Sequence, residues 1–384
     1  MKVREMWSPF QDKKMVINIA KKINQIATNL KKQGYERINI MHVCGTHEHT
    51  ITYYGLRTLL PLNVNVIAGP GCPVCVVPAN EIDEAIKLAE EGIKVFTYGD
   101  MYRVPGSQKS LAMAKADGAN VSIVYGFPDA VQLAKKLDKD AVFFGVGFET
   151  TAPTAASFIV RNKIPQNLSI LMSYRITVPA VEYVLKSNHE LNGIICPGHV
   201  STIVGAGAWS FISEKYHLPT VIAGFEPVDV MLAIYEILRQ LEEGDVRTVN
   251  EYRRVVKWEG NIVAKKYLDD AFMVIDAHWR GIGTISKSGW ALQERFNNLD
   301  AREKYGIRIE HGIDIKGDCK CADIILGKSI PTDCPYFGNS CKPQHPIGPC
   351  MVSSEGTCSI WFKYGGHLSR KLKRVDTVSY THLT

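Results

Sequence analysis

Residues 37–49 read RINIMHVCGTHEH. Four of the first seven positions are apolar, which is typical of a strand, and the six residues that follow carry a thiol, two imidazoles and a carboxylate. We expect a strand over 37–43 and a helix that begins at Thr46 or His47. Functional loops of parallel sheets lie at the carboxyl ends of strands. This stretch therefore predicts both an α/β fold and a candidate site.

Apolar runs alternate with amphipathic stretches along most of the chain. A first helix is expected at 13–33, where apolar residues recur at helical spacing and Gly34 ends the run. Strands are expected at 37–43, 64–68, 93–98, 120–125, 140–145, 168–172, 193–196 and 219–223, and helices at 80–91, 107–117, 128–137, 151–162, 178–187 and 227–242. Such alternation predicts βαβ units and parallel sheets that are covered on both faces.

The sequence also echoes itself. CGTH at 44–47 is followed 22 residues later by VIAG at 66–69, and CPGH at 196–199 is followed 25 residues later by VIAG at 221–224. Weak self-similarity of this kind is typical of a duplicated unit. The alternative is a chance similarity between strands that end in glycine.

We therefore predict two similar parallel-sheet α/β domains, at 36–125 and 126–245. The remaining residues, 1–35 together with 246–384, form a smaller helical and iron–sulfur domain in this prediction. Segment 280–358 is rich in Gly, Pro and Cys, so it can bury little apolar surface. Small domains of that kind usually need a metal or a cluster for stability.

The composition is that of a globular protein, since 46% of the 384 residues are hydrophobic and 22% are charged. Much of the net charge of +6 comes from the end of the chain, where the basic run 370–374 has the pattern of a solvated tail. The nearly neutral body lacks the excess of basic residues that is typical of nucleic-acid-binding proteins. No apolar stretch is long enough to span a membrane, and the N-terminus lacks the apolar core of a secretory signal. We expect a cytoplasmic protein without a membrane or nucleic-acid partner.

Ten cysteines in a cytoplasmic chain point to metal, cluster or redox chemistry, because thiols are kept reduced there. Cys44 follows a predicted strand and precedes a predicted helix, with His47 and His49 close by in sequence. A helix N-terminus and nearby imidazoles favour the thiolate, which is a nucleophile or a soft ligand for Fe(II). The alternative is an inert, buried cysteine.

A second cysteine motif, GPGCPVC at 69–75, also follows a predicted strand. Its Cys72 and Cys75 have the C-x-x-C spacing of a redox disulfide or of two ligands on one metal. The chain has no second C-x-x-C, which disfavours a zinc ribbon, and the βαβ context favours thiol–disulfide chemistry. The alternatives are half of a metal site and plain packing.

Six further cysteines lie within 40 residues near the C-terminus: Cys319, Cys321, Cys334, Cys341, Cys350 and Cys358. Prolines are interleaved with them, as in a loop that wraps around a cluster. Four thiolates at variable spacing are typical of iron–sulfur clusters, whereas zinc sites usually show tight pairs. The spacing therefore favours an iron–sulfur cluster over zinc.

Three further loops, YGD at 98–100, GFETT at 147–151 and GFEP at 224–227, place a glycine before an acid at the end of a predicted strand. Glycine lets a ligand approach the backbone and an acid can bind it, so these loops are candidates to face the same cleft. The alternative is that each acid caps the next helix. No phosphate-binding or dinucleotide-binding glycine motif is present.

These motifs together resemble the HypD family of NiFe-hydrogenase maturation proteins. The stretches that carry the resemblance are CGTHEH at 44–49, GPGCPVC at 69–75, YGDM at 98–101, RVPGS at 103–107, GFETT at 147–151 and PCMVSSEG at 349–356. The residues between Cys321, Cys334, Cys341 and Cys358 number 12, 6 and 16, which is similar to the 4Fe–4S motif of the family. The resemblance covers about residues 1–366.

The resemblance implies an assembly scaffold with redox activity rather than a metabolic enzyme, folded as two similar α/β domains and a cluster domain. It implies that a HypC-like small chaperone joins the protein and that a HypE-like donor delivers cyanide. Iron with cyanide and carbon monoxide ligands then passes to the large subunit of NiFe-hydrogenase. Cys44 would hold this iron together with a chaperone cysteine, and His47 would line the site. Cys72 and Cys75 would be the redox pair, and the four spaced cysteines would bind the 4Fe–4S cluster.

Two other interpretations compete with the scaffold. A free-standing iron–sulfur thiol–disulfide oxidoreductase needs only the cluster and the C-x-x-C pair, so an additional iron anchor at Cys44 distinguishes the scaffold from it. A zinc-stabilised binding module would be colourless. Within the resemblance, Cys319 competes with Cys321 as a cluster ligand, and Cys350 lies between the third and fourth ligands. The tail 375–384 matches nothing expected at the end of a family member.

Overall fold

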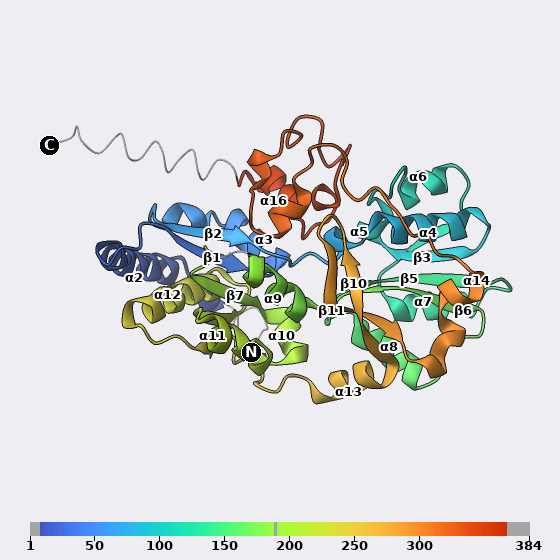
Figure 1. Ribbon diagram of the computed structural model, residues 1–384, viewed down its shortest axis with the longest axis horizontal. Coiled ribbons are helices and arrows are strands. Elements are labelled where there is room, and N and C mark those ends of the chain that lie inside the picture. The colour runs from blue at the N-terminus through green and yellow to red at the C-terminus, as the bar shows by residue number, and fades with distance from the viewer. Residues whose placement is uncertain (1–7, 188–189, 367–384) are drawn as a thin grey trace.

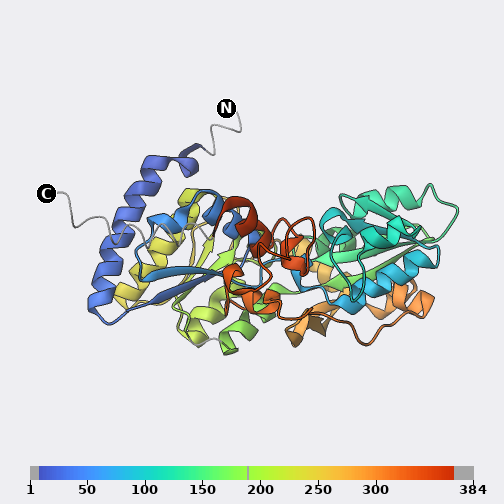
Figure 2. The ribbon, with the colours of Figure 1, turned by 90° about the horizontal axis from the view of Figure 1, so that it is seen from above.

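The computed structural model describes residues 8–187 and 190–366. Two α/β bodies, each built on a parallel sheet, lie side by side, and the cysteine-rich C-terminal segment lies over their junction (Figure 1, Figure 2). The predicted fold class, α/β with two parallel sheets and a cysteine-rich part, is confirmed. The basic run 370–374 and the tail 375–384 lie outside the described residues.

The first sheet, called sheet A here, has five parallel strands in the order β2-β1-β7-β8-β9. Their bounds are β1 (Ile38–His42), β2 (Val64–Ala68), β7 (Gly193–Pro197), β8 (Thr220–Ala223) and β9 (Thr248–Asn250). Every residue of β1, β7 and β8 is buried, because helices cover both faces. One face is covered by α2 (Lys13–Lys32) and α12 (Pro227–Glu243), and the other by α9 (Thr177–Ser187), α10 (Gly198–Val204) and α11 (Ser210–Tyr216).

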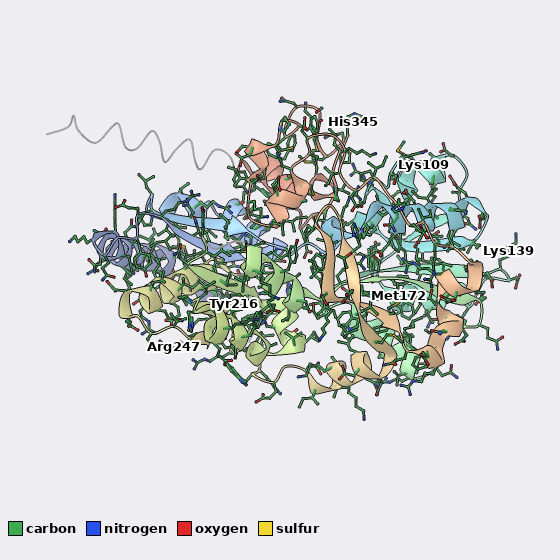
Figure 3. All side chains as sticks on the ribbon, viewed as in Figure 1. Lys109, Lys139, Met172, Tyr216, Arg247 and His345 are labelled. Carbon is green, nitrogen blue, oxygen red and sulfur yellow. A yellow bond between two sulfur atoms is a disulfide. The ribbon has the colours of Figure 1, made fainter. Side chains whose placement is uncertain are left out.

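The second sheet, sheet B, has four parallel strands in the order β4-β3-β5-β6. Their bounds are β3 (Lys94–Tyr98), β4 (Val121–Val124), β5 (Ala141–Gly147) and β6 (Leu168–Tyr174). One face is covered by α4 (Ala79–Glu90) and α6 (Leu111–Ala116), and the other by α7 (Phe127–Ala134) and α8 (Ala152–Val160). Side chains fill the space between these layers, with Met172 of β6 inside and Lys139 at the rim (Figure 3).

All eight predicted strands are present as β1 to β8, and the predicted helices recur with small shifts. The helix predicted at 107–117 is the exception, since α6 covers only Leu111–Ala116. The first helix begins where expected, because the carboxylate of Asp12 accepts hydrogen bonds from the backbone N–H groups of Lys14 and Met15.

The division of strands between the sheets differs from the predicted ranges 36–125 and 126–245. Strands β1 and β2 pair with β7 and β8 in sheet A, whereas β3 and β4 pair with β5 and β6 in sheet B. The chain therefore leaves sheet A after Ala68, builds sheet B, and returns at Gly193. The sequence echo belongs to sheet A alone, where its strands β1 and β7 are neighbours and β2 and β8 flank them. The physical reason is that the pairing of β1 with β7, which are distant in sequence, decides which strands share a sheet, and nearness in sequence does not.

An antiparallel hairpin of β10 (Phe272–Trp279) and β11 (Gly283–Leu292) joins the two bodies and was not predicted. Three consecutive residues of β10, from Val274 to Asp276, are exposed, and the register shifts between Ile275 and Ala277. This bulge breaks the alternation by which a half-buried strand is recognised in a sequence. The flanking helices α13 (Ile262–Ala271) and α14 (Ala301–Tyr305) were also missed.

The C-terminal segment contains two short helices, α15 (Cys321–Ile325) and α16 (Thr357–Tyr364), joined by irregular loops. α16 packs on α3 (Gly45–Tyr53) of the first body. The 3-10 turn Pro349–Met351 packs on the turn Val74–Val76, which holds part of the C-x-x-C motif. The cysteine-rich segment therefore contacts both cysteine motifs of the N-terminal half.

Candidate redox and metal-binding site

The switch point of sheet A lies between β1 and β7, from which the chain runs outward in opposite directions. In open α/β sheets, the crevice at the carboxyl ends of such strands is the usual ligand site. Cys44 follows β1 at this edge, and the loop 69–75 follows β2. His199 and Phe225 follow β7 and β8, and their rings stack with centroids 4.0 Å apart.

Cys44 is the N-cap residue of α3 and is buried. The backbone of the C-x-x-C loop is pressed against it, since a Cβ at Gly71 would lie 2.5 Å from Cys44 Cα. On the other side, a Cβ at Gly45 would lie 2.5 Å from the Cβ of Glu355. Glycine is required at both positions because no side chain fits between these backbones. Three segments that are distant in sequence thus meet at one thiol.

The expectation that Cys44 favours its thiolate is wrong for the protein without a metal. Burial raises the pKa of the Cys44 thiol to about 11, and the carboxylate of Glu355 raises it further. Hydrogen bonds from the backbone N–H groups of Thr46 and His47 act in the opposite direction, but they do not compensate. The thiol is therefore protonated near pH 7 until a cation replaces the proton.

His47 is fully buried, and its Nε2 lies 2.9 Å from the carbonyl oxygen of Gly224. A carbonyl accepts only, so Nε2 carries the proton. Burial, followed by the charge of His42, lowers the pKa of His47 to about 3, so the ring is neutral. Among the described residues, Nδ1 of His47 has no hydrogen-bond partner. By contrast, His49 lies away from Cys44, since its Nε2 bonds to the Tyr364 hydroxyl at 3.2 Å.

A polar residue that the sequence did not reveal, His42, lines the same cavity as Cys44. Its Nδ1 lies 3.1 Å from the Cys44 carbonyl oxygen, and its Nε2 lies 2.8 Å from Glu48 Oε2. Its ring therefore lies between two hydrogen-bond acceptors, the Cys44 carbonyl and the Glu48 carboxylate. Burial raises the pKa of the Glu48 carboxyl, but the guanidinium of Arg57 and His42 together hold it well below its usual range.

Cys72 and Cys75 form a disulfide, and both are buried. They line one cavity together with Cys44, Glu355 and Cys350. The first two predicted cysteine sites, which lie in separate loops of the sequence, are therefore brought together. A cysteine of the C-terminal segment completes the wall.

The six C-terminal cysteines line a second cavity with apolar neighbours such as Ile324, Phe337 and Met351. Cys350 lines both this cavity and the one that holds Cys44. The backbone N–H of Cys358 donates to Cys350 Sγ at 3.2 Å. Within the described part of the chain, no three His, Cys, Asp or Glu side chains converge as they would on a single metal ion.

Comparison with known proteins places this arrangement in a family. The sequence profile of HypD, described as "Hydrogenase formation hypA family", matches residues 14–365. This chain belongs to the HypD family. A chain of Methanocaldococcus jannaschii named for hydrogenase expression and formation is 46% identical over 92% of this chain and 98% of that relative. The hydrogenase maturation factor HypD of Escherichia coli is 39% identical over 91% of this chain and 95% of its own length. That of Azotobacter vinelandii is 40% identical over 85% and 89%.

In this HypD chain, the three loops that pair glycine with an acid do not share one cleft. Asp100 accepts from the backbone N–H and the hydroxyl of Ser354, both at 3.0 Å, so it ties sheet B to the C-terminal segment. Glu149 accepts from the N–H and hydroxyl of Thr177 at the start of α9. Glu226 is the N-cap of α12. Helix capping therefore explains the acids of the second and third loops.

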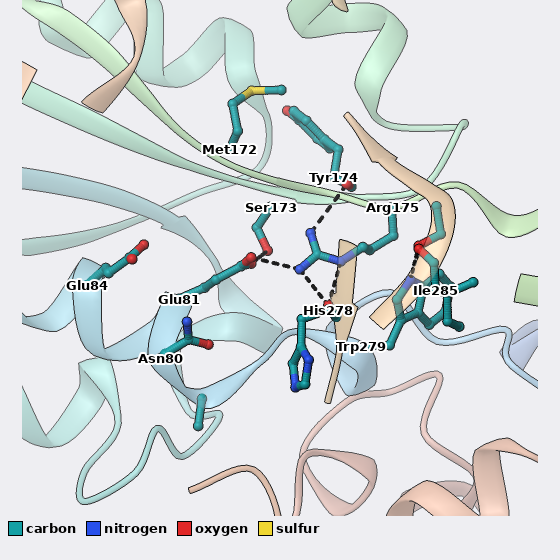
Figure 4. Close-up of polar contacts among 12 residues, drawn as sticks. Asn80, Glu81, Glu84, Met172, Ser173, Tyr174, Arg175, His278, Trp279 and Ile285 are labelled. Atoms are coloured by element: carbon teal, nitrogen blue, oxygen red, sulfur yellow. Dashed lines mark hydrogen bonds and ion pairs between the residues drawn. The ribbon is translucent and has the colours of Figure 1, made fainter. Parts of the chain in front are cut away.

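Helix α4, which follows the C-x-x-C loop, is anchored by buried ion pairs (Figure 4). Arg175, the residue after β6, lies 2.8 Å from Glu81 Oε1 and also donates to the carbonyl of His278 in the hairpin. Ser173 donates to the other oxygen of Glu81. Arg302 of α14 donates to Glu84 at 2.8 Å. Sheet B, the hairpin and α14 therefore hold the loop that carries the disulfide in place.

The helices of the described chain are short or polar compared with a membrane span. Over residues 8–187 and 190–366, none is both long enough and apolar enough to cross a membrane.

Proposed function

We propose that this HypD protein is the scaffold on which iron receives cyanide and carbon monoxide for NiFe-hydrogenase. In this proposal it acts in the cytoplasm with a HypC-like chaperone and a HypE-like cyanide donor. The observation that carries the proposal is the shared cavity of Cys44, the Cys72–Cys75 disulfide and Cys350. A metal-anchoring thiol, a redox pair and a cysteine-rich segment are the three parts that such an assembly needs. All three line one cavity at the carboxyl ends of β1 and β2.

Cys44 is proposed as the anchor of the iron, which is cargo rather than a resident cofactor. Its sulfur is a soft donor that suits an iron carrying cyanide. Iron binding displaces the thiol proton, which the buried site otherwise retains. The neutral His47 follows Cys44 by three residues and its Nδ1 has no partner among the described residues, so it is proposed to line the iron site. A cysteine of the chaperone supplies a further sulfur in this proposal.

The C-terminal cysteines are proposed to hold a 4Fe–4S cluster, with Cys321, Cys334, Cys341 and Cys358 as the ligands and Cys319 or Cys350 as possible replacements. The donor set fits such a cluster, since each iron takes one thiolate and the six thiols surround one apolar space. Burial, followed by the charge of Cys321, raises the pKa of Cys319 to about 12. Crowded thiolates of this kind need positive charge nearby. When bound, the cluster would supply electrons one at a time.

Cys72 and Cys75 are proposed to cycle between disulfide and dithiol. Reduction breaks the S–S bond and takes up two electrons and two protons, giving two thiols. Cys350 lies in the walls of both cavities, so it is the described residue that links the C-terminal thiols to the disulfide. The ion pairs that anchor α4 hold the disulfide loop in place. The reduced pair then provides the electrons for steps at the iron.

The competing function is a free-standing iron–sulfur thiol–disulfide oxidoreductase, which needs no group at Cys44. The deciding experiment is anaerobic purification with a HypC-like chaperone, followed by infrared spectroscopy of metal-bound cyanide and carbonyl stretches. We expect the bands in the wild type and in Cys196→Ala, a buried cysteine of β7 that lines neither cavity. Cys44→Ala should lose the bands while keeping its visible absorbance. Bands that persist in Cys44→Ala would place the anchor elsewhere, whereas a wild type without the bands would leave the oxidoreductase as the better description.

A further inference from the structure

A buried cation outside the site described above is Arg280, at the turn between β10 and β11. Its side chain is 1% exposed. Its Nε donates to the carbonyl of Asp314 and its Nη1 to the carbonyl of Pro105, both at 2.8 Å. Its Nη2 has no hydrogen-bond partner among the described residues. A guanidinium with an unused donor in the interior is costly, so a partner of negative charge is expected nearby.

Arg280 lies between the two redox sites. Its backbone N–H donates to the carbonyl of Val76, the residue after Cys75, at 2.9 Å. The next residue, Gly281, packs on Ala322, which follows Cys321, since a Cβ at Gly281 would lie 3.1 Å from that of Ala322. The hairpin turn is thus held between the disulfide loop and the first cluster cysteines.

The electrostatics agree with this position. Burial lowers the pKa of Arg280, and the charges that oppose this are, from the largest to the smallest, those of Cys321, Asp314, Cys319 and Asp83. Among the described residues, neither Asp314 nor any other carboxylate forms an ion pair with its guanidinium. Among these opposing charges, that of Cys321, the residue beside Ala322, is the largest. An arginine keeps its charge even when buried.

We propose that Arg280 is the buried counter-charge that tunes the reduction potential of the cluster on the C-terminal cysteines. This inference rests on the proposed cluster. Reduction adds one electron and one negative charge, with no bond formed and no proton taken up. A fixed cation nearby stabilises that extra charge, and charge and hydrogen bonds at the sulfurs are what set cluster potentials. Arg280 thus makes the cluster easier to reduce, and it acts as a positioning residue rather than a ligand.

The test is a potentiometric titration of the full-length protein, purified anaerobically and followed by electron paramagnetic resonance of the reduced cluster. Arg280→Met should lower the equilibrium constant for reduction about tenfold, which for one electron is a midpoint lower by about 59 mV. Arg280→Lys keeps the charge and should stay close to the wild type. Arg295→Met, at an exposed position, is the control for removing an arginine.

A purely structural role for Arg280 would reduce the amount of cluster without moving the midpoint of the clusters that form. An unmoved midpoint in Arg280→Met, or an equal shift in Arg280→Lys, would overturn the inference. If Arg280→Met forms no cluster, wild-type protein with ¹⁵N-labelled arginine decides the matter. A hyperfine coupling between the reduced cluster and a labelled arginine nitrogen, seen by pulsed electron paramagnetic resonance, supports the inference, and its absence overturns it. A wild type with no reducible cluster would instead refute the proposed function.

Discussion

Replacing Glu48 by glutamine should strongly destabilise the joint between α3 and α16. Its side chain is fully buried and accepts five hydrogen bonds. Oε1 accepts from Thr52, Arg57 and Trp361, and Oε2 accepts from His42 and Arg57. In Glu48→Gln, one oxygen becomes an NH₂ group that faces donors. We expect the NH₂ group at the position of Oε2, because fewer donors face Oε2 than face Oε1.

The loss is then the two hydrogen bonds at Oε2, from His42 and Arg57, and the guanidinium of Arg57 loses its buried counter-charge. A hydrogen bond to a charged group contributes about 1.5–3 kcal/mol, and breaking one partner of a buried ion pair costs about 3–5 kcal/mol. We expect a destabilisation of about 3–5 kcal/mol, a large part of the roughly 5–15 kcal/mol that holds a typical domain folded. The matched control is Glu243→Gln, an exposed i,i+4 partner of Arg239, for which we expect about 0.5 kcal/mol or less.

Hydrogen exchange of the peptides 45–53 and 357–364 is the assay, because it reports local opening of α3 and α16. A loss of about 3–5 kcal/mol corresponds to exchange faster by roughly two to three and a half powers of ten. The folded pKa of Glu48 lies below its ordinary value of 4.5, so its stabilisation is complete above pH 4.5 and declines as the pH falls below it. As the pH falls, the difference in the free energy of local opening between the wild type and Glu48→Gln should become smaller. A gap below 1 kcal/mol at pH 7 would refute the reasoning.

Three shorter predictions concern the same junction. Gly45→Ala should destabilise the protein by about 1–3 kcal/mol in urea unfolding, because the new methyl group has no space. The control Gly99→Ala should be nearly neutral, since a Cβ there would lie 3.8 Å from its nearest neighbour, Ile123 Cγ2. Equal effects of the two substitutions would contradict the packing argument. Cys334→Ala should lose most bound iron and sulfide and the brown colour, as metal analysis and absorbance will show; a colourless wild type with one zinc would contradict the cluster. In the unfolded protein, Cys72→Ser should leave Cys75 open to alkylation without reductant, whereas the wild type needs two electrons first. Identical labelling of Cys75 in both would exclude a redox disulfide.

The strands were predictable from sequence because each depends on a short apolar run, which is local information. Their pairing was not, since β1 joins β7 across 150 residues of intervening chain and leaves no local trace. The echo between 44–69 and 196–224 contained the clue, but similarity does not say whether two units lie in one sheet or in two. Register and hydrophobic contacts over the whole chain decide that.

The candidate cysteines were predictable because loops at the ends of parallel strands meet at one edge. The residues that set the charge of the site were not. His42 lies within a strand, where the sequence indicates burial but not which acceptors its ring will meet. The pKa of Cys44 depends on Glu355, which is distant in sequence. Arg280 lies in a hairpin whose bulge hid it from pattern recognition.

The interrupted path of the chain through sheet A has a consequence for synthesis on the ribosome. Strands β1 and β2 emerge early, but β7, the partner that completes β1, begins 151 residues after β1 ends. At roughly 5–20 residues per second, translation takes about 8–30 s to cover that stretch. During this interval sheet B, from 94 to 174, can close, whereas β1 offers an unpaired edge and the thiols of the first two motifs face solvent. Nascent chains of this protein should therefore depend on holdase chaperones until Pro197 has left the exit tunnel.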